Sequence, residues 1–246
     1  EKSDKNLSPL ESVVSSLTDR FLEQKLVRFQ KMKREKMISL KNTTKSSLVT
    51  YFENQDDEVI YPRNDDANFL LGKGSFGAVY FGMYESSSSC SKLSASSASS
   101  SVSEFIPIAI KVLTISNQNE KKQVEKEIKN LQLMENPEDK YAVVQFKGYA
   151  MHQSEISSTC DYFLAQELGL CNVMQLFDGQ TIASFPPQIK RDRRCLYQLK
   201  VEIVKEICRA VESIHRNKSY KIAHGDLHET NILVMLDGKV KLTDVG

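Results

Sequence analysis

The C-terminal stretch Ile222–Gly246 constrains the fold most, because it has the pattern of a tight β-hairpin with acidic residues at both ends. Two short apolar runs, Ile232–Met235 and Lys239–Thr243, lie on either side of Asp237-Gly238. An Asp-Gly pair between two strand-like runs is a strong signal for a two-residue turn. In such a hairpin, the end of the second run lies beside the start of the first.

This hairpin predicts a small oxygen-rich site. Asp226 and Asn231 precede the first run, and Asp244 follows the second. Carboxylate and amide oxygens suit a hard cation such as Mg²⁺, which usually arrives with phosphate. The alternative is a surface hairpin whose acidic side chains are simply solvated.

Composition excludes several classes of protein. The 246 residues are 40% hydrophobic and 26% charged with a net charge of +1, so bulk charge does not indicate a nucleic-acid partner. No apolar run approaches the roughly 20 residues of a membrane span. The five cysteines show no metal-binding spacing, which favours a reduced, cytoplasmic protein. The chain begins at Glu1, so a removed targeting peptide stays open.

The N-terminal region, residues 1–50, predicts a basic amphipathic helix and a linker. Ser8-Pro9 begins a helix whose apolar stripe continues through Phe29 into the basic run KMKREKM, and residues 41–50 have the composition of a linker. Such a helix packs on a neighbouring domain or lies on a membrane surface, and we favour packing. Residues 51–68 form an acidic, turn-rich connector.

A glycine-rich segment follows this connector. Phe69–Leu71 starts a strand that runs into Gly72, Gly74 and Gly77, and a second strand-like run follows. Glycines let backbone N–H groups approach phosphate oxygens closely. A dinucleotide-binding turn has the same spacing but leads into a helix, so the segment here predicts a hairpin lid.

Residues 86–103 are a serine-rich, low-complexity insert, either a phosphorylation target or a passive loop. A strand with one lysine, Lys111, follows at residues 105–113. The amphipathic pattern of residues 119–134 predicts a helix on which Glu127 lies beside the inner stripe and can reach a lysine on a neighbouring strand. Glu125 is the competing candidate.

The remaining pattern predicts further strands and helices. Residues 141–151 and 161–168 have the pattern of strands, residues 173–177 that of a short helix and residues 193–217 that of a long helix.

The order of these motifs resembles that of the eukaryotic protein kinase family from about Phe69 onward. The matching segments are LGKGSFGAVY, the lysine strand IAIK, the helix glutamate, HGDLHETN in place of the family's H-R-D-L-x-x-x-N, and DVG in place of D-F-G. Five motifs in the family order are far more specific than any one of them.

The resemblance implies an α+β, bilobal fold. Residues 69–168 would form an N-lobe with a five-stranded antiparallel sheet and one regulatory helix, and residues 169–246 the hinge and the first part of a helical C-lobe. It also implies a protein kinase that uses ATP and Mg²⁺ to phosphorylate a protein hydroxyl, of the Ser/Thr type because the catalytic loop lacks the A-A-R or R-A-A insert of tyrosine kinases.

The resemblance also implies roles for individual residues. Asp226 would orient the substrate hydroxyl, Asn231 and Asp244 would bind Mg²⁺, and Lys111 would hold the ATP phosphates and pair with Glu127. The expected ATP-binding residues are Leu71, Gly72, Gly74, Gly77, Val79, Ala109, Lys111, Glu167, Gly169 and Leu233. Gln166 stands at the position of the residue that limits the back of the adenine pocket.

Three departures from the family pattern stand out. Gly225 replaces an arginine that pairs with a phosphorylated activation loop, so we expect activity that does not depend on this pairing. His228 replaces a lysine that contacts the γ-phosphate. The chain ends at Gly246, before the activation segment, so we expect residues 1–246 alone to phosphorylate a protein poorly.

Two alternative functions remain open: a pseudokinase scaffold, and a small-molecule phosphotransferase, which the H-G-D-L-H pattern also resembles. The serine-rich insert and divergent catalytic loop are also loosely similar to secreted parasite kinases of the rhoptry type, an alternative to the cytoplasm.

Overall fold

The computed structural model divides the chain into two compact units. One, which we call the sheet unit, comprises residues 29–122 and 146–167, and the other, the helical unit, comprises residues 1–28, 123–145 and 168–246. The structure describes residues 7–41, 48–52, 57–63, 66–74, 77–86, 104–134, 142–154, 159–216 and 223–245.

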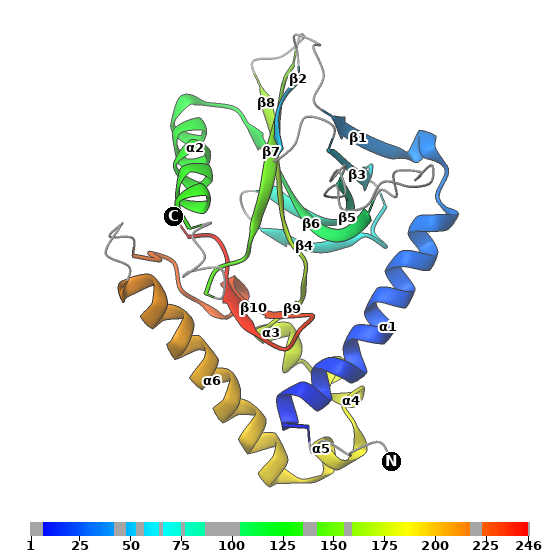
Figure 1. Cartoon of the computed structure of the whole chain (residues 1–246), viewed down its shortest axis with the longest axis vertical. Helices are drawn as coiled ribbons and strands as arrows, with labels where there is room; N and C mark the ends of the chain where they lie inside the picture. Colours follow the sequence, from blue (N-terminus) through cyan, green and yellow to red (C-terminus); the bar gives the residue numbers. More distant parts are fainter. Residues whose placement is uncertain are drawn as a thin grey trace, which may run out of the picture. The chain divides into compact units, whose positions relative to one another are not determined.

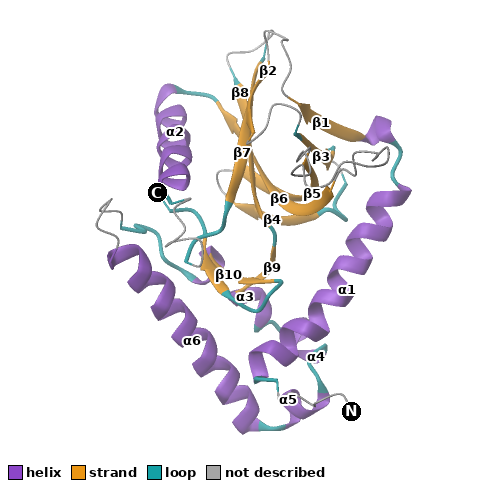
Figure 2. Cartoon of the chain, viewed as in Figure 1, coloured by secondary structure: helices purple, strands orange, loops and turns teal. Residues whose placement is uncertain are grey.

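The described part of the sheet unit is built on one antiparallel sheet of eight strands (Figures 1 and 2). The strands are β1 (Met37–Lys41), β2 (Leu48–Phe52), β3 (Glu58–Pro62), β4 (Leu70–Gly74), β5 (Gly77–Ser86), β6 (Glu104–Ile115), β7 (Phe146–Gln153) and β8 (Cys160–Glu167). Their order is β1-β3-β5-β6-β8-β7-β2, and β4 also pairs with β5. Strands β4 to β8 confirm the five predicted strands, and the α+β class is confirmed with them.

Strands β1, β2 and β3 were not predicted. The linker at residues 41–50 and the connector at residues 51–68 contain β2 and β3, and β1 starts at Met37, the last residue of the basic run into which the helix was expected to continue. Helix α1 ends at Lys31, and a single 3₁₀ turn, η1 (Arg34–Lys36), leads into β1. Runs this short form strands only when a neighbouring sheet supplies the pairing, so their local pattern is weak.

Strand β5 explains how the extra strands join the sheet. Its first half pairs with β4 from Gly74↔Gly77 to Leu70↔Tyr80, and its second half pairs with β3 from Ile60↔Met83 to Glu58↔Glu85. Both partners therefore lie on the same edge of β5, one after the other. The long β5–β6 pairing, from Ala78↔Val112 to Ser86↔Glu104, covers the other edge.

Side chains on one face of the sheet form an aromatic and aliphatic core. Tyr61 of β3 lies 5.8 Å, centroid to centroid, from Phe163 of β8, although β5 and β6 separate these strands in the sheet. The sheet therefore curls, and β1 and β3 cover this face. The core comprises Leu40, Val59, Tyr61, Tyr80, Tyr84, Ile108, Ile110, Val112, Ala150, Phe163 and Ala165.

The helical unit holds the predicted hairpin and long helix. Its elements are the first part of α1 (Pro9–Lys31), α2 (Gln118–Leu133) from Gln123 onward, β9 (Gly169–Asn172), α3 (Val173–Leu176), α4 (Gly179–Ala183), α5 (Pro187–Arg191), α6 (Arg193–Arg216), η2 (Glu229–Asn231), β10 (Ile232–Met235) and β11 (Val240–Leu242). Strands β11, β10 and β9 form a small antiparallel sheet among the described residues.

The first turn of helix α1 contacts helix α6. Ser8 and Glu11 form the predicted capping box, in which the Ser8 N–H donates to Glu11 and the Glu11 N–H donates to the Ser8 hydroxyl. The Leu10 N–H donates to the Glu202 carboxylate of α6 at 2.9 Å. Leu10, Val13 and Val14 are buried, so the first turns of α1 pack against protein.

Two further expectations concern the serine-rich insert and membrane spans. Residues 87–103 of the insert lie outside the described residues. Among the described helices, none combines the length and the apolar character needed to cross a membrane.

Candidate functional site

The β10–β11 hairpin places Asn231 and Asp244 at neighbouring strand ends. The hairpin forms, but its loop has three residues rather than the predicted two, because the Met235 N–H donates to the Lys239 carbonyl at 2.8 Å and leaves Leu236, Asp237 and Gly238 between them. Gly238 has a φ of +83°, and the Asp237 carboxylate accepts the Lys239 N–H at 3.0 Å. Strand β11 begins at Val240 and pairs with β10 from Val234↔Val240 to Ile232↔Leu242. The start of one strand and the end of the other thus lie together.

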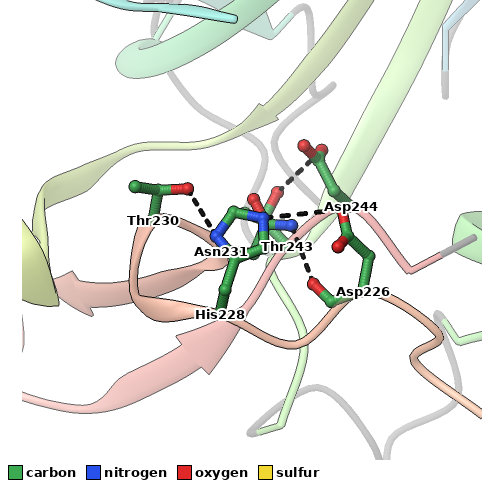
Figure 3. A network of polar contacts seen from close by, with 6 residues as sticks. All are labelled: Asp226, His228, Thr230, Asn231, Thr243 and Asp244. Carbon is green, nitrogen blue, oxygen red and sulfur yellow. Dashed lines mark hydrogen bonds and ion pairs between the residues drawn. The ribbon is translucent and has the colours of Figure 1, made fainter.

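Asn231 connects three backbone segments of this site (Figure 3). Its side-chain amide donates to the Asp226 carbonyl at 3.0 Å, and its own carbonyl accepts the Thr243 N–H at 3.0 Å. Its N–H donates to the His228 carbonyl at 3.0 Å. Asn231 is buried, whereas the Asp226 side chain is 75% exposed. The loop therefore fixes the Asp226 backbone and leaves its carboxylate accessible.

Asp244 has a backbone conformation that is uncommon for a residue with a side chain. Its φ is +57°, in the left-handed region, where strain is typical of functional positions. The Thr243 hydroxyl lies 3.5 Å from Asp244 Oδ1. The next residue, Val245, is buried, and its carbonyl accepts a hydrogen bond from the Asn130 side chain of α2 at 3.3 Å. Helix α2 thus holds the backbone directly after Asp244.

Gly225 and His224 fit the tight corner before Asp226. Gly225 has a φ of +79°, which a glycine adopts without strain. His224 is buried, and burial lowers the pKa of its ring, while the Thr243 backbone and the carboxylates of Asp244 and Asp226 act in the opposite direction. Burial of His224 therefore favours the uncharged form of its ring.

The structure adds one polar side chain, Thr230, to the surroundings of Asp226 that sequence reasoning missed. Thr230 Oγ1 lies 2.8 Å from His228 Nδ1, and His228 Nε2 lies 3.4 Å from Asp226 Oδ2 (Figure 3). The spacing Asp-x-His-x-Thr was visible in the sequence, but the turn at η2 that brings these three side chains together was not.

In the sheet unit, three predicted site residues share one face of the sheet. Val79 of β5 and Lys111 of β6 are direct cross-strand partners, and Ala109 lies two residues before Lys111. Their neighbours Ile108, Ile110 and Val112 belong to the aromatic core on the other face. The Lys111 side chain is half-buried, and the residues next to it in β6 are packed in the core.

The glycine-rich segment forms the predicted hairpin between β4 and β5, with Gly74 opposite Gly77. Leu71, Gly72 and Gly74 lie in β4. A methyl group added at Gly72 would meet no atom within 4 Å, whereas one at Gly77 would lie 2.1 Å from the Val112 carbonyl oxygen. Ser75 and Phe76, at the tip, lie outside the described residues.

Two of the remaining adenine-site candidates lie together. Gly169 of β9 faces Leu233 of β10, and a methyl group on Gly169 would stand 3.1 Å from the Leu233 side chain. In the sheet unit, Gln166 and Glu167 end strand β8. Gln166 is buried, and its side-chain NH₂ has no hydrogen-bond partner among the described residues.

Glu127 lies on α2 in the helical unit, half-buried beside Val124, Ile128 and Leu131 as predicted, whereas Glu125 is exposed. Lys111 belongs to the sheet unit, so the pairing of Lys111 with Glu127 stays a prediction. No group of three His, Cys, Asp or Glu side chains suited to a metal occurs in the part of the chain that the structure describes. The predicted Mg²⁺ site uses Asn231 and Asp244, with phosphate oxygens as further ligands.

Comparison with known proteins identifies the family. The family model of protein tyrosine and serine/threonine kinases matches residues 67–246, so this chain belongs to that family. The chain is also 25% identical over 204 residues to the U-box domain-containing protein 70 of Oryza sativa subsp. japonica. That similarity covers 82% of this chain and 20% of the relative, so the chain spans about a fifth of that protein's length.

Proposed function

We propose that this chain is the catalytic region of an ATP- and Mg²⁺-dependent protein kinase that phosphorylates serine or threonine. One observation carries the proposal: Asn231 anchors the Asp226 backbone, while the Asp226 carboxylate remains exposed beside it. A carboxylate that is exposed, on a residue whose backbone is held by hydrogen bonds, can orient a substrate hydroxyl.

The residues around Asn231 fit a magnesium ion. Because the Asn231 NH₂ group is used by the Asp226 carbonyl, its side-chain oxygen can serve as a metal ligand beside a carboxylate oxygen of Asp244. When bound, Mg²⁺ neutralises charge on the phosphate oxygens. The +57° backbone of Asp244 and the Asn130–Val245 hydrogen bond hold this carboxylate in place.

Each unit, taken by itself, contains residues that suit part of an ATP molecule. Gly72 and Gly74 leave open space for close approach to phosphate oxygens, and Lys111 supplies a cation on the same sheet face as Val79 and Ala109. The Gln166 NH₂ group, which has no hydrogen-bond partner among the described residues, suits a polar ligand atom at the back of an adenine site. The family resemblance also implies adenine contacts for Leu233, Gly169 and the backbone of Glu167, and a role for Glu127 as the partner of the phosphate-binding lysine.

The test is a phosphotransfer assay on the full-length protein with a library of serine, threonine and tyrosine peptides. We expect Asp226→Asn and Lys111→Met each to reduce the rate by about a hundredfold or more, because they remove the hydroxyl-orienting acid and the phosphate-binding cation. Exposed Lys190 of α5 donates from its ammonium group to the Ala183 carbonyl at 3.0 Å and matches none of the family's motif positions, so Lys190→Met is the matched control and should retain the rate.

Each alternative function predicts a different outcome. Nucleotide binding without transfer to any peptide would indicate a pseudokinase. Transfer to a metabolite but not to peptides would indicate a small-molecule phosphotransferase, which the H-G-D-L-H sequence also fits. If Asp226→Asn matched wild type, the assignment of Asp226 would be wrong.

A further inference from the structure

We infer that Thr230 and His228 are positioning residues that fix the orientation of the Asp226 carboxylate. This inference rests on the proposed phosphotransfer function and goes beyond it, because it assigns a role to a threonine outside the motif positions compared above. The three side chains form a chain of polar contacts within one short loop, from Thr230 Oγ1 to His228 Nδ1 at 2.8 Å and from His228 Nε2 to Asp226 Oδ2 at 3.4 Å (Figure 3).

The chemistry of the groups sets the direction of the contacts. An ionised carboxylate only accepts hydrogen bonds, so His228 must present an Nε2–H to Asp226. Nδ1 of the neutral ring then accepts a hydrogen bond from the Thr230 hydroxyl. If both ring nitrogens carry hydrogen, the same hydroxyl can accept instead, so the arrangement does not depend on the charge of the ring.

Hydrogen bonds hold the backbone of the loop that carries these three side chains. The 3₁₀ turn η2 (Glu229–Asn231) begins directly after His228, and the Asn231 N–H donates to the His228 carbonyl at 3.0 Å. Asn231 then bonds the Asp226 carbonyl. The backbones of all three partners are therefore fixed by Asn231, and only rotation of the side chains remains to be restricted.

The consequence concerns the two oxygens of Asp226. With Oδ2 turned toward His228, Oδ1 is left for the substrate hydroxyl. Without Thr230 the imidazole can flip or change tautomer, and the 75%-exposed carboxylate loses its preferred orientation. The expected defect lies in kcat rather than in KM for peptide or ATP, since ground-state binding does not need this orientation.

The kinetic test is a double-mutant cycle in the full-length protein. We expect Thr230→Val to lower kcat about three- to tenfold with KM unchanged, the range for loss of one ordinary hydrogen bond. Thr230→Ser keeps the hydroxyl and should restore kcat to near the wild-type value. In the His228→Gln background, Thr230→Val should have no further effect, because the ring it holds is absent.

A threonine distant from the loop provides the matched control. The exposed Thr114 hydroxyl donates to the Asp161 carboxylate at 2.7 Å in the sheet unit, so Thr114→Val removes a similar hydrogen bond and should leave kcat unchanged. An equal loss from Thr230→Val in the wild-type and His228→Gln backgrounds would overturn the inference, since Thr230 would then act through its neighbour Asn231.

A spectroscopic test does not require activity. The sequence has only four histidines, so ¹⁵N-histidine labelling with His228→Gln as the assignment variant isolates the His228 ring. At a pH where the ring is neutral, we expect a dominant Nε2–H tautomer in wild type and a tautomer mixture in Thr230→Val. A mixture already present in wild type would overturn the inference.

These outcomes separate the two claims. An inactive wild type, or full activity in Asp226→Asn, would refute the proposed function and leave the tautomer result to decide the Thr230–His228 contact. An active wild type with an unaltered Thr230→Val rate would refute the positioning role alone.

Discussion

At the scale of single residues, Gly77 is the position in the β4–β5 hairpin where the structure leaves no room for a side chain. Its φ is +153°, and an added methyl group would lie 2.1 Å from the Val112 carbonyl oxygen, a backbone atom that cannot move independently of β6. Gly72, in the same hairpin, has open space around it. Packing therefore excludes a side chain at Gly77 but not at Gly72, although both belong to one glycine motif.

We expect Gly77→Ala to lower the free energy of unfolding by about 2 kcal/mol or more, because the clash forces β5 away from β6. Gly72→Ala should change it by less than about 1 kcal/mol. Chemical denaturation of both variants beside wild type measures the difference. Equal stability of Gly77→Ala and wild type would contradict the strand geometry described for this hairpin.

Residue-level chemistry also limits what the sequence could predict of the site. Asp226, Asn231 and Asp244 were found from their positions around the hairpin, and the structure bonds Asn231 to the backbones of Asp226 and of Thr243, the residue before Asp244. Thr230 and Asn130 were not found, because their contacts depend on a 3₁₀ turn and on the packing of α2. No local pattern encodes such side-chain orientations.

At the scale of elements, the sequence predicted strands and helices whose pattern is long or repeated. The alternation in β6 and the apolar stripe of α6 belong to this class, and both elements were expected within about two residues of their observed bounds. Strands β1 and β3 were missed, because each is a short run beside charged residues. Their stability comes from the sheet face that they cover.

Two tyrosines of that covered face differ in hydrogen bonding. Tyr84 of β5 donates its hydroxyl to the buried Asp57 carboxylate just before β3. The Tyr61 hydroxyl is buried without a partner among the described residues, and burial, with Asp161 nearby, raises the pKa of Tyr61. Removing the Tyr84 hydroxyl should therefore lower the free energy of unfolding, whereas removing the Tyr61 hydroxyl should not.

We expect Tyr84→Phe to lower the free energy of unfolding by about 1–2 kcal/mol, because it takes a donor from a buried carboxylate. Tyr61→Phe should leave stability unchanged or raise it by up to about 1 kcal/mol, since an unpaired buried hydroxyl is destabilising. Thermal or urea denaturation of both variants provides the measurement. A larger loss from Tyr61→Phe than from Tyr84→Phe would contradict this assignment of hydrogen bonds.

At the scale of the whole molecule, the family match at residues 67–246 covers less than the folded structure. Residues before this match contribute to both units: the first turns of α1 bury Leu10, Val13 and Val14 in the helical unit, and β1 and β3 cover the core face of the sheet unit. The N-terminal region is thus part of the packed protein in each unit.

Two truncations test this dependence. A chain that begins at residue 33 loses the apolar contacts of α1 and should unfold at a lower temperature than the chain of residues 1–246. A chain that begins at residue 66 also loses β1, β2 and β3 and should bind a hydrophobic dye and aggregate, because the face that holds Ile108, Ile110 and Val112 becomes exposed. A stable monomer of residues 66–246 that binds no dye would contradict the role given to these strands.

The long ladder between β5 and β6 has a consequence for how the chain tolerates inserted sequence. Its last register pair, Ser86↔Glu104, fixes both ends of the connection at residues 87–103, so pairing of the strands does not depend on what joins them. Doubling the number of residues between two fixed chain ends costs only about 0.6 kcal/mol in loop-closure entropy. This connection is therefore a permissive position, where insertions can accumulate or a reporter can be placed while the lysine strand keeps its register.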